Sequence, residues 1–403
     1  MPGGELDVAA AAVRPAEQQA QPPLPVARAW EAARRALPAV AGYAALRIVS
    51  MGAYAALVDV LGRYGQRSLL TPVDSGWYRL IAVHGYSLPA SRGYSGSVFG
   101  YFPLYPVLMH YGALATGLSV EAVGLAVTWL AALAGAWALF EIGARLRSPR
   151  TGVLLAALWA VAPAAVTESI AYADTLAIAL SAWSLYALLR RSWLAAAVLA
   201  ALAGFTRPTA VAAAAAVSLA ALAAIVHGEP GGRGWRVWAA GLLAPAGTAA
   251  FVAYVAVRTG RLDGYLIAQQ QGWQTHPDGG VSTAKRLLAG LVMTDPVYRS
   301  APAIISTIVL IAVPVLIAIQ IKQRQPWPLI VYTVVVAGLV YGDQHLYTTS
   351  PREMLALFPL LLPAARALDR IGSTRWLVAL LAVLGLASAW YGAYAMIMQG
   401  TVP

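Results

Sequence analysis

Long apolar runs, separated by short polar breaks, occupy most of this chain. A predominantly apolar run of about 17–25 residues is long enough to cross a bilayer as one helix. The pattern predicts about eleven such spans, at 38–61, 119–144, 151–168, 172–189, 193–206, 208–227, 237–257, 301–321, 327–342, 353–369 and 375–397. The predicted fold class is an all-α polytopic membrane protein.

The segment 99–117 is apolar but is predicted not to cross the membrane. It begins with two prolines, Pro103 and Pro106, and contains His110. If it lies on the outer surface and the N-terminus is cytoplasmic, the short inner connections are basic, as the positive-inside rule requires. If it crossed instead, the basic connections from Arg145 onward would all lie outside. The charge pattern therefore favours an outer-surface segment.

The composition changes abruptly near residue 37. Residues 1–36 are rich in Ala, Pro, Gln and Glu and have no sustained apolar period, which predicts a disordered or amphipathic cytoplasmic N-terminus. Residues 37–403 are predicted to form a single transmembrane domain. Two long outer loops interrupt it, at 62–118 and 258–300.

Composition narrows the function classes. Hydrophobic residues make up 60% of the chain and charged residues 11%, against about a quarter in soluble proteins, so most of the surface must face lipid. The net charge of +11 reflects arginines beside spans rather than nucleic-acid binding. The chain has no cysteine. Alanine is abundant and arginine greatly outnumbers lysine, which is typical of a high-GC bacterium. We therefore expect a multi-pass protein of the bacterial cytoplasmic membrane. No cleavable signal peptide precedes the first span.

Polar residues that are costly near a membrane gather at the predicted outer ends of the spans. Ionisable groups in such places are usually kept for function. The candidates are Asp74, Arg79, His84, Glu168, Tyr172, Asp174, Arg207, Gln270, Trp273, Asp343, His345 and Arg352. Their loops are far apart in sequence but share one side of the membrane, as the residues of an extracytoplasmic active site would.

Each charged candidate has a structural and a functional interpretation. Asp74 is either the N-cap of a helix or a general base at the start of a surface helix. Arg207 and Arg352 either reach lipid phosphates or clamp a substrate phosphate with the guanidinium fork. Glu168 and Asp174 are expected to pair with one of these arginines, which would join the outer ends of the spans.

The neutral candidates suit a sugar better than a metal. Trp77 and His84 lie at helical spacing on the predicted surface helix after Asp74, and no metal-site spacing surrounds His84 or His345. Gln270 and Trp273 offer an amide and an aromatic face. The chain has no nucleotide-binding or nucleophile motif, so an enzyme of this kind would take an activated substrate from the membrane.

Several of these residues lie in motifs of a known family. The stretch from Asp74 to Tyr86, followed by Tyr101-Phe-Pro-Leu-Tyr-Pro106, resembles the PIG-V family of mannosyltransferases and its bacterial homologues. Weaker matches are the Glu168–Asp174 segment, Thr206-Arg207, Gln270-x-x-Trp273, and Ser350-Pro351-Arg352 before Phe358-Pro359. The resemblance covers about residues 40–370. The tryptophan that precedes the aspartate in the family is Val73 here.

The resemblance implies a GT-C-type fold and an inverting transfer of mannose from polyprenyl-phosphate mannose. Asp74 matches the acidic residue that acts as base, Arg207, Arg352 and His345 would hold the donor phosphate, and no metal or other cofactor is implied. The remaining candidates, Trp77, His84, Glu168, Tyr172, Asp174, Gln270 and Trp273, would contact the sugar or acceptor. The implied partners are the lipid donor and a lipid or glycolipid acceptor, with no nucleic acid.

Three other functions remain open at this point. A different GT-C enzyme would use another lipid-linked sugar or a protein acceptor. A transporter or flippase for lipid-linked sugars would need polar residues along the spans, whereas the spans here are apolar and polarity gathers at one face. A non-catalytic membrane scaffold would not need Asp74.

Overall fold

The computed structural model describes residues 25–60, 73–87, 97–228, 232, 234–293, 296–344 and 349–399. Within these ranges, the side chains at 25–29, 73, 74, 97 and 396–399 are outside the description. His345 is one of the residues that lie outside the described ranges.

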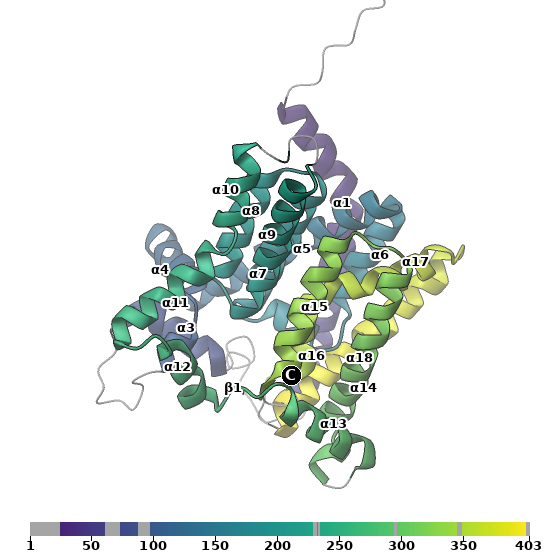
Figure 1. Ribbon diagram of the computed structural model, residues 1–403. Coiled ribbons are helices and arrows are strands. Elements are labelled where there is room, and N and C mark those ends of the chain that lie inside the picture. Colours follow the sequence, from purple (N-terminus) through teal and green to yellow (C-terminus); the bar gives the residue numbers. More distant parts are fainter. Residues whose placement is uncertain are drawn as a thin grey trace, which may run out of the picture. The chain divides into compact units, whose positions relative to one another are not determined.

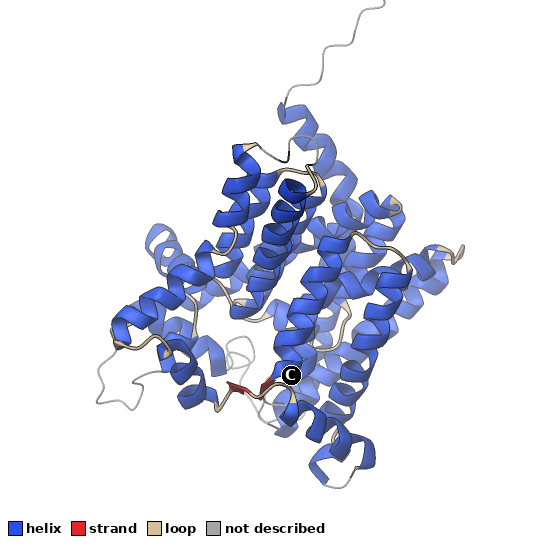
Figure 2. Ribbon diagram, in the orientation of Figure 1, coloured by secondary structure: helices blue, strands red, loops and turns tan. Residues whose placement is uncertain are grey.

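Helices account for nearly all of the described chain (Figure 2). In the first half they are α1 (Pro25–Val60), α3 (Val73–His84), η2 (Ser97–Gly100), α4 (Leu104–Thr116), α5 (Val120–Leu146), α6 (Pro149–Ala160), η3 (Ala165–Ser169), α7 (Asp174–Leu189), α8 (Trp193–Gly204), η4 (Pro208–Ala210) and α9 (Val211–Val226). In the second half they are α10 (Trp235–Leu243), α11 (Ala246–Thr259), α12 (Gly264–Trp273), α13 (Val281–Val292), η5 (Pro296–Arg299), α14 (Ala301–Lys322), α15 (Trp327–Gly342), α16 (Ser350–Glu353), η7 (Met354–Leu361), α17 (Leu362–Asp369) and α18 (Thr374–Gln399).

One short antiparallel ladder joins two distant segments. Strand β1 (His276–Pro277) pairs with β2 (Asp343–Gln344), with His276 opposite Gln344 and Pro277 opposite Asp343. The ladder ties the segment after α12 to the end of α15. It therefore brings part of the predicted outer loop 258–300 beside the end of the predicted span 327–342.

The chain divides into two compact units after Arg35, which lies within α1. The first unit contributes only residues 25–35 to the described structure. In the second unit, α5, α7, α8 and α9 pack one against the next, as Figure 1 shows, and α15 packs against α9. Their shared core is rich in alanine and leucine, so helix backbones approach closely without large side chains between them.

Glycines permit the close crossing of α5 and α6. The turn between α5 and α6 is fixed by Ser148, whose hydroxyl accepts a hydrogen bond from the Thr151 amide, and by Pro149 in the first turn of α6. Gly143 precedes this turn and Gly152 follows it, and a Cβ added to Gly143 would lie 2.6 Å from the Gly152 Cα. A Cβ added to Gly152 would collide with the Phe140 carbonyl oxygen. The two helices can lie this close only because both positions lack a side chain.

Every predicted span contains helix, but the helices differ in how well each could cross a membrane alone. By length and composition, five described helices are long and apolar enough, or six if the bent pair α10 and α11 counts as one span. Helices α7, α8 and α15 are apolar but shorter. The predicted span 151–168 is broken into α6 and η3.

The segment 99–117 contains one short helix. Helix α4 has 13 residues and is therefore about 20 Å long, shorter than the roughly 30 Å hydrocarbon layer. It packs against α3 and α5, and the His110 Nδ1 lies 2.7 Å from the Ala82 carbonyl oxygen of α3. Helices α3 and α4 thus form a pair beside the start of α5.

Candidate functional site

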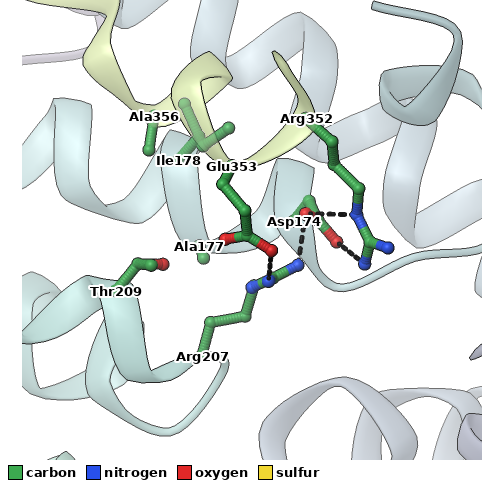
Figure 3. A pocket seen from close by; sticks show the side chains of 8 residues that line it. All are labelled: Asp174, Ala177, Ile178, Arg207, Thr209, Arg352, Glu353 and Ala356. Carbon is green, nitrogen blue, oxygen red and sulfur yellow. Dashed lines mark hydrogen bonds and ion pairs between the residues drawn. The ribbon is translucent and has the colours of Figure 1, made fainter. Parts of the chain in front are cut away.

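Two arginines and two carboxylates from three distant segments meet in one cluster, shown in Figure 3. The Arg352 Nε and Nη2 atoms donate to Asp174 Oδ1 and Oδ2, each at 3.1 Å. Arg207 Nη1 also donates to Asp174 Oδ1, while its Nη2 donates to Glu353 Oε1 at 2.8 Å. These four residues line a hollow with about 210 Å³ of free space, including space open to solvent.

The cluster is electrically balanced, since two guanidinium groups face two carboxylates. The two carboxylates are not equivalent, however. Asp174 accepts hydrogen bonds from both arginines, and its side chain is 6% exposed. Among the described residues, Glu353 bonds only to Arg207, and its side chain is 22% exposed. Glu353 is therefore the carboxylate that can leave the cluster at lower cost.

Local sequence explains how each side chain reaches the cluster. Helix α7 begins at Asp174, where the partial positive charge of a helix N-terminus favours a carboxylate. Arg207 is in extended conformation because it precedes Pro208, which starts η4. Pro351 lies in the first turn of α16, and Arg352 and Glu353 follow it. All three positions are at helix ends, as the sequence pattern predicted.

The start of α3 is tethered beside this cluster. The Arg352 guanidinium carbon lies 4.5 Å from the centre of the buried Tyr172 ring. One residue earlier, the Ala171 carbonyl oxygen accepts a hydrogen bond from the Ser75 hydroxyl at 3.0 Å. Asp74 directly precedes Ser75 in α3, so its backbone lies close to the segment that supports Arg352. The Asp74 side chain itself is outside the description.

Three aromatic rings from α3, the segment after η2, and α12 pack together. The Trp77 and Tyr101 ring centres are 6.0 Å apart, Tyr101 and Trp273 are 5.0 Å apart, and Trp77 and Trp273 are 6.2 Å apart. A Cβ at Gly100 would lie 2.6 Å from the Trp273 ring, so this glycine allows the contact. Both tryptophans that the sequence singled out therefore belong to one aromatic cluster.

The neighbouring glutamine, rather than the predicted one, anchors α12. Gln269 Nε2 donates to the Gly100 carbonyl oxygen at 3.3 Å and to the Tyr265 hydroxyl at 2.8 Å, whereas Gln270 is exposed. Tyr265 interacts electrostatically with Arg207, Asp343 and Glu353. Burial raises the pKa of Tyr265, so its hydroxyl keeps its proton. Helix α12 thus lies within electrostatic reach of the cluster.

Glu168 does not pair with the cluster arginines, and that expectation was wrong. Its Oε2 accepts a hydrogen bond from the Tyr43 hydroxyl at 2.7 Å. Beside it, the buried Arg47 donates to the Ser169 hydroxyl at 2.9 and 3.0 Å and to the Ala160 carbonyl oxygen at 3.2 Å. Glu168 therefore helps to join η3 to α1, a structural role separate from the four-residue cluster.

The remaining predicted residues lie elsewhere or outside the description. His84 is exposed at the end of α3, and Arg79 forms an ion pair with Glu121 at 2.5 Å. His345 falls in the undescribed segment 345–348. Among the described residues, no group of three His, Asp or Glu side chains could hold a metal ion.

Sequence reasoning missed several residues that the structure brings to these sites. Arg47 could have been found, because a charge inside an apolar run is itself a signal. Glu353 follows Arg352 directly, but adjacency did not indicate that it would reach Arg207. Tyr101 begins the Tyr101–Pro106 motif but was given no role of its own, and nothing in the sequence separated Gln269 from the neighbouring Gln270.

Comparison with known proteins identifies the fold but no family. No protein-family model matches the chain, and no curated protein matches it. Two crystal structures of ArnT from Cupriavidus metallidurans do match, one in the apo state and one bound to undecaprenyl phosphate. Each has a TM-score of 0.51 at 17% sequence identity over 90% of this chain.

The chain spans 66% of the length of the ArnT chain that it matches. At this level of identity the similarity establishes the fold. The predicted class is thereby confirmed: the chain is a helical, multi-pass membrane protein with the GT-C-type fold of ArnT.

Proposed function

We propose that this protein is a membrane glycosyltransferase that takes a sugar from a polyprenyl-phosphate donor and passes it to an acceptor hydroxyl. The observation that carries the proposal is the pairing of Arg207 with Arg352 at the ends of apolar helices. Two guanidinium groups at one point suit a phosphate, which arginine binds through paired N–H donors. The shared fold with ArnT, one structure of which is bound to undecaprenyl phosphate, supports the same ligand class.

The neutral cluster sets a condition on donor binding. A phosphate that joined Arg207, Arg352, Asp174 and Glu353 without any change would leave uncompensated negative charge in a largely buried site, which is costly. Glu353 is the more exposed carboxylate and has one arginine partner. The donor phosphate is therefore expected to replace Glu353 on Arg207, while Asp174 keeps both guanidinium groups aligned.

Asp74 is proposed as the general base. Its place at the start of α3, next to Ser75, which is bonded to the Ala171 carbonyl, supports a position near the phosphate. The carboxylate would take the proton from the acceptor hydroxyl, whose oxygen forms a bond to the anomeric carbon. The bond from that carbon to the phosphate oxygen breaks, and polyprenyl phosphate leaves with the electron pair. A β-linked donor then gives an α-linked product.

The aromatic cluster is proposed to hold the sugar or the acceptor. The cluster consists of Trp77 on α3, Tyr101 after η2, and Trp273 on α12. Aromatic rings of this kind stack well on the apolar face of a sugar ring. Glu168 has surroundings that do not support the expected contact with substrate, because it is bonded to Tyr43. His84 is exposed at the end of α3 and stays a candidate.

The proposal also has more specific parts. The donor sugar is proposed to be mannose, the protein to be PIG-V-like, and the site to lie on the extracytoplasmic face of a bacterial membrane. They rest on the Asp74–Tyr86 and Tyr101–Pro106 motifs and on the basic inner connections. Val73, in place of the family tryptophan, alters one residue beside the proposed base, so a donor other than mannose is the main alternative.

The test is a donor screen with purified protein. Short-chain polyprenyl phosphates that carry mannose, glucose or a pentose are incubated with extracted lipid acceptors, and products are identified by mass spectrometry. We expect transfer from the mannosyl donor and loss of transfer in Asp74→Asn. Asp263→Asn, an equal change at an exposed residue paired with Arg261, is the control. Full activity of folded Asp74→Asn would remove Asp74 as the base.

A further inference from the structure

A second hollow, at the other end of the helices, is lined by three arginines. Arg147 follows α5, Arg366 lies on α17, and Arg370 follows α17; Gln323, directly after α14, completes the polar part of the lining. The hollow holds roughly 750 Å³ of free space, including space open to solvent. It shares no lining residue with the cluster around Asp174.

Helix α7 shows how far apart the two sites lie. Asp174 is its first residue and belongs to the first cluster. At its other end, the Leu189 carbonyl oxygen accepts a hydrogen bond from Arg145, two residues before Arg147. The 16 residues of α7 span about 24 Å. The arginine hollow is therefore beside the membrane face opposite the proposed catalytic end.

The three arginines of this hollow have no carboxylate partner in the part of the chain that the structure describes. None of the described residues that line it is acidic. Asp369 is close in sequence, but its carboxylate accepts hydrogen bonds from Ser148 and Thr151 and faces Arg150. Arg147 also repels Arg366 electrostatically. This contrasts with the first cluster, where each guanidinium has a carboxylate partner.

Hydrogen-bonding groups near the hollow are also left unsatisfied. Arg366 Nη1 donates to the neutral Gln323 Oε1 at 3.0 Å, while its buried Nε has no partner in the described part of the chain. The side-chain amides of Gln320 and Gln325, three and two residues from Gln323, are buried without described partners as well. Buried polar groups normally bond to protein, water or an ion, so such a group calls for an explanation.

The C-terminal ends of three helices offset only part of the positive charge of the hollow. Arg147, Gln323 and Arg370 each follow the last residue of a helix. A helix C-terminus carries about half a negative charge, so three of them offset about 1.5 of the three positive charges. The remaining positive charge, about 1.5, is enough to attract an anion such as a phosphodiester, which carries one negative charge.

We propose that this arginine hollow binds a phosphate group, and that the group belongs to the headgroup of an anionic membrane lipid. Leu146, Pro363 and Ala367 form an apolar side of the hollow, which suits a lipid better than a free ion. The three guanidinium groups would donate to the phosphate oxygens. The site is independent of the proposed function, because it uses none of the residues assigned to the transfer reaction.

The test is lipid binding to the purified full chain in detergent, measured by native mass spectrometry. The probes are short-chain phosphatidylglycerol, the zwitterionic short-chain phosphatidylcholine, and inorganic phosphate. The variant Arg147→Gln with Arg370→Gln changes two exposed side chains of the hollow. The control, Arg190→Gln with Arg236→Gln, removes the same charge from exposed arginines outside the hollow.

We expect the unchanged protein to hold one phosphatidylglycerol molecule tightly. The affinity for this lipid should fall by about tenfold or more in the hollow variant, which corresponds to the loss of at least one charged contact. It should not fall in the control. Preference for phosphatidylglycerol over inorganic phosphate assigns the lipid source, whereas equal binding of both assigns a free phosphate site. Equal losses in the two double variants would overturn the proposal, because binding would then follow net charge alone. Absence of binding by every probe would overturn it as well.

Discussion

At the scale of single residues, the two carboxylates of the cluster, Asp174 and Glu353, are expected to contribute differently to folding. Asp174 bonds to both arginines in a buried place, so its removal leaves two guanidinium groups with one partner. Such uncompensated buried charge costs about 3–5 kcal/mol. Glu353 is partly exposed and bonds to one arginine, so its contribution to folding is expected to be small.

This difference predicts effects of different size for two conservative changes. Asp174→Asn should lower the thermal unfolding midpoint strongly, whereas Glu353→Gln should lower it only slightly. Glu353→Gln should also bind short-chain polyprenyl phosphate more tightly than the unchanged protein, because no carboxylate then has to leave Arg207. Thermal unfolding in detergent, with and without the lipid phosphate, measures both effects. Weaker binding by Glu353→Gln would contradict the idea that the donor phosphate displaces Glu353.

At the scale of elements, the sequence predicted helices well and their irregularities less well. Each predicted apolar run contains helix, because a segment in lipid must satisfy its backbone hydrogen bonds internally. By length and composition, five or six of the described helices could cross a membrane alone. The division of 151–168 into α6 and η3, and the 40° bend between α10 and α11, depend on tertiary packing. For the same reason, the sequence indicated Asp174 as an arginine partner but could not separate it from Glu168.

The crossing of α5 and α6 gives a prediction at this scale. Gly152→Val places a side chain against the Phe140 carbonyl oxygen, so the helices must move apart. Overpacking of this kind costs about 1–3 kcal/mol. Gly338→Val is the matched control, because a Cβ there meets nothing within 4 Å. Thermal unfolding of both variants should show a clear loss for Gly152→Val alone, and equal stability would mean that the crossing is adaptable.

At the scale of the whole molecule, the proposed function depends on which side of the membrane the cluster faces. The order of helices and the GT-C-type fold are established, while the orientation rests on the basic connections between spans. Helix α4 is the decisive segment, since counting it as a span would reverse every later loop. Its packing on α3 and the two prolines that begin the segment favour a surface position.

Labelling of single cysteines tests this orientation, because the chain has no cysteine of its own. Tyr111→Cys introduces a thiol at an exposed site on α4, next to His110. Arg236→Cys places one at the exposed start of α10, which is predicted to be cytoplasmic. A membrane-impermeant maleimide should label the first in intact cells and the second only after permeabilisation. The reverse pattern would place the Asp174 cluster in the cytoplasm.

The balanced charges of the cluster also bear on how this protein can change over evolution. A single substitution among Asp174, Arg207, Arg352 and Glu353 alters the net charge of a largely buried site. Descendants that lose Asp174 or one of the two arginines are therefore expected to survive mainly when a second member changes with it. The three segments that carry these residues are far apart in sequence, with 178 positions between Asp174 and Arg352. They should nonetheless be inherited as one unit, and correlated substitution among related sequences would reveal it.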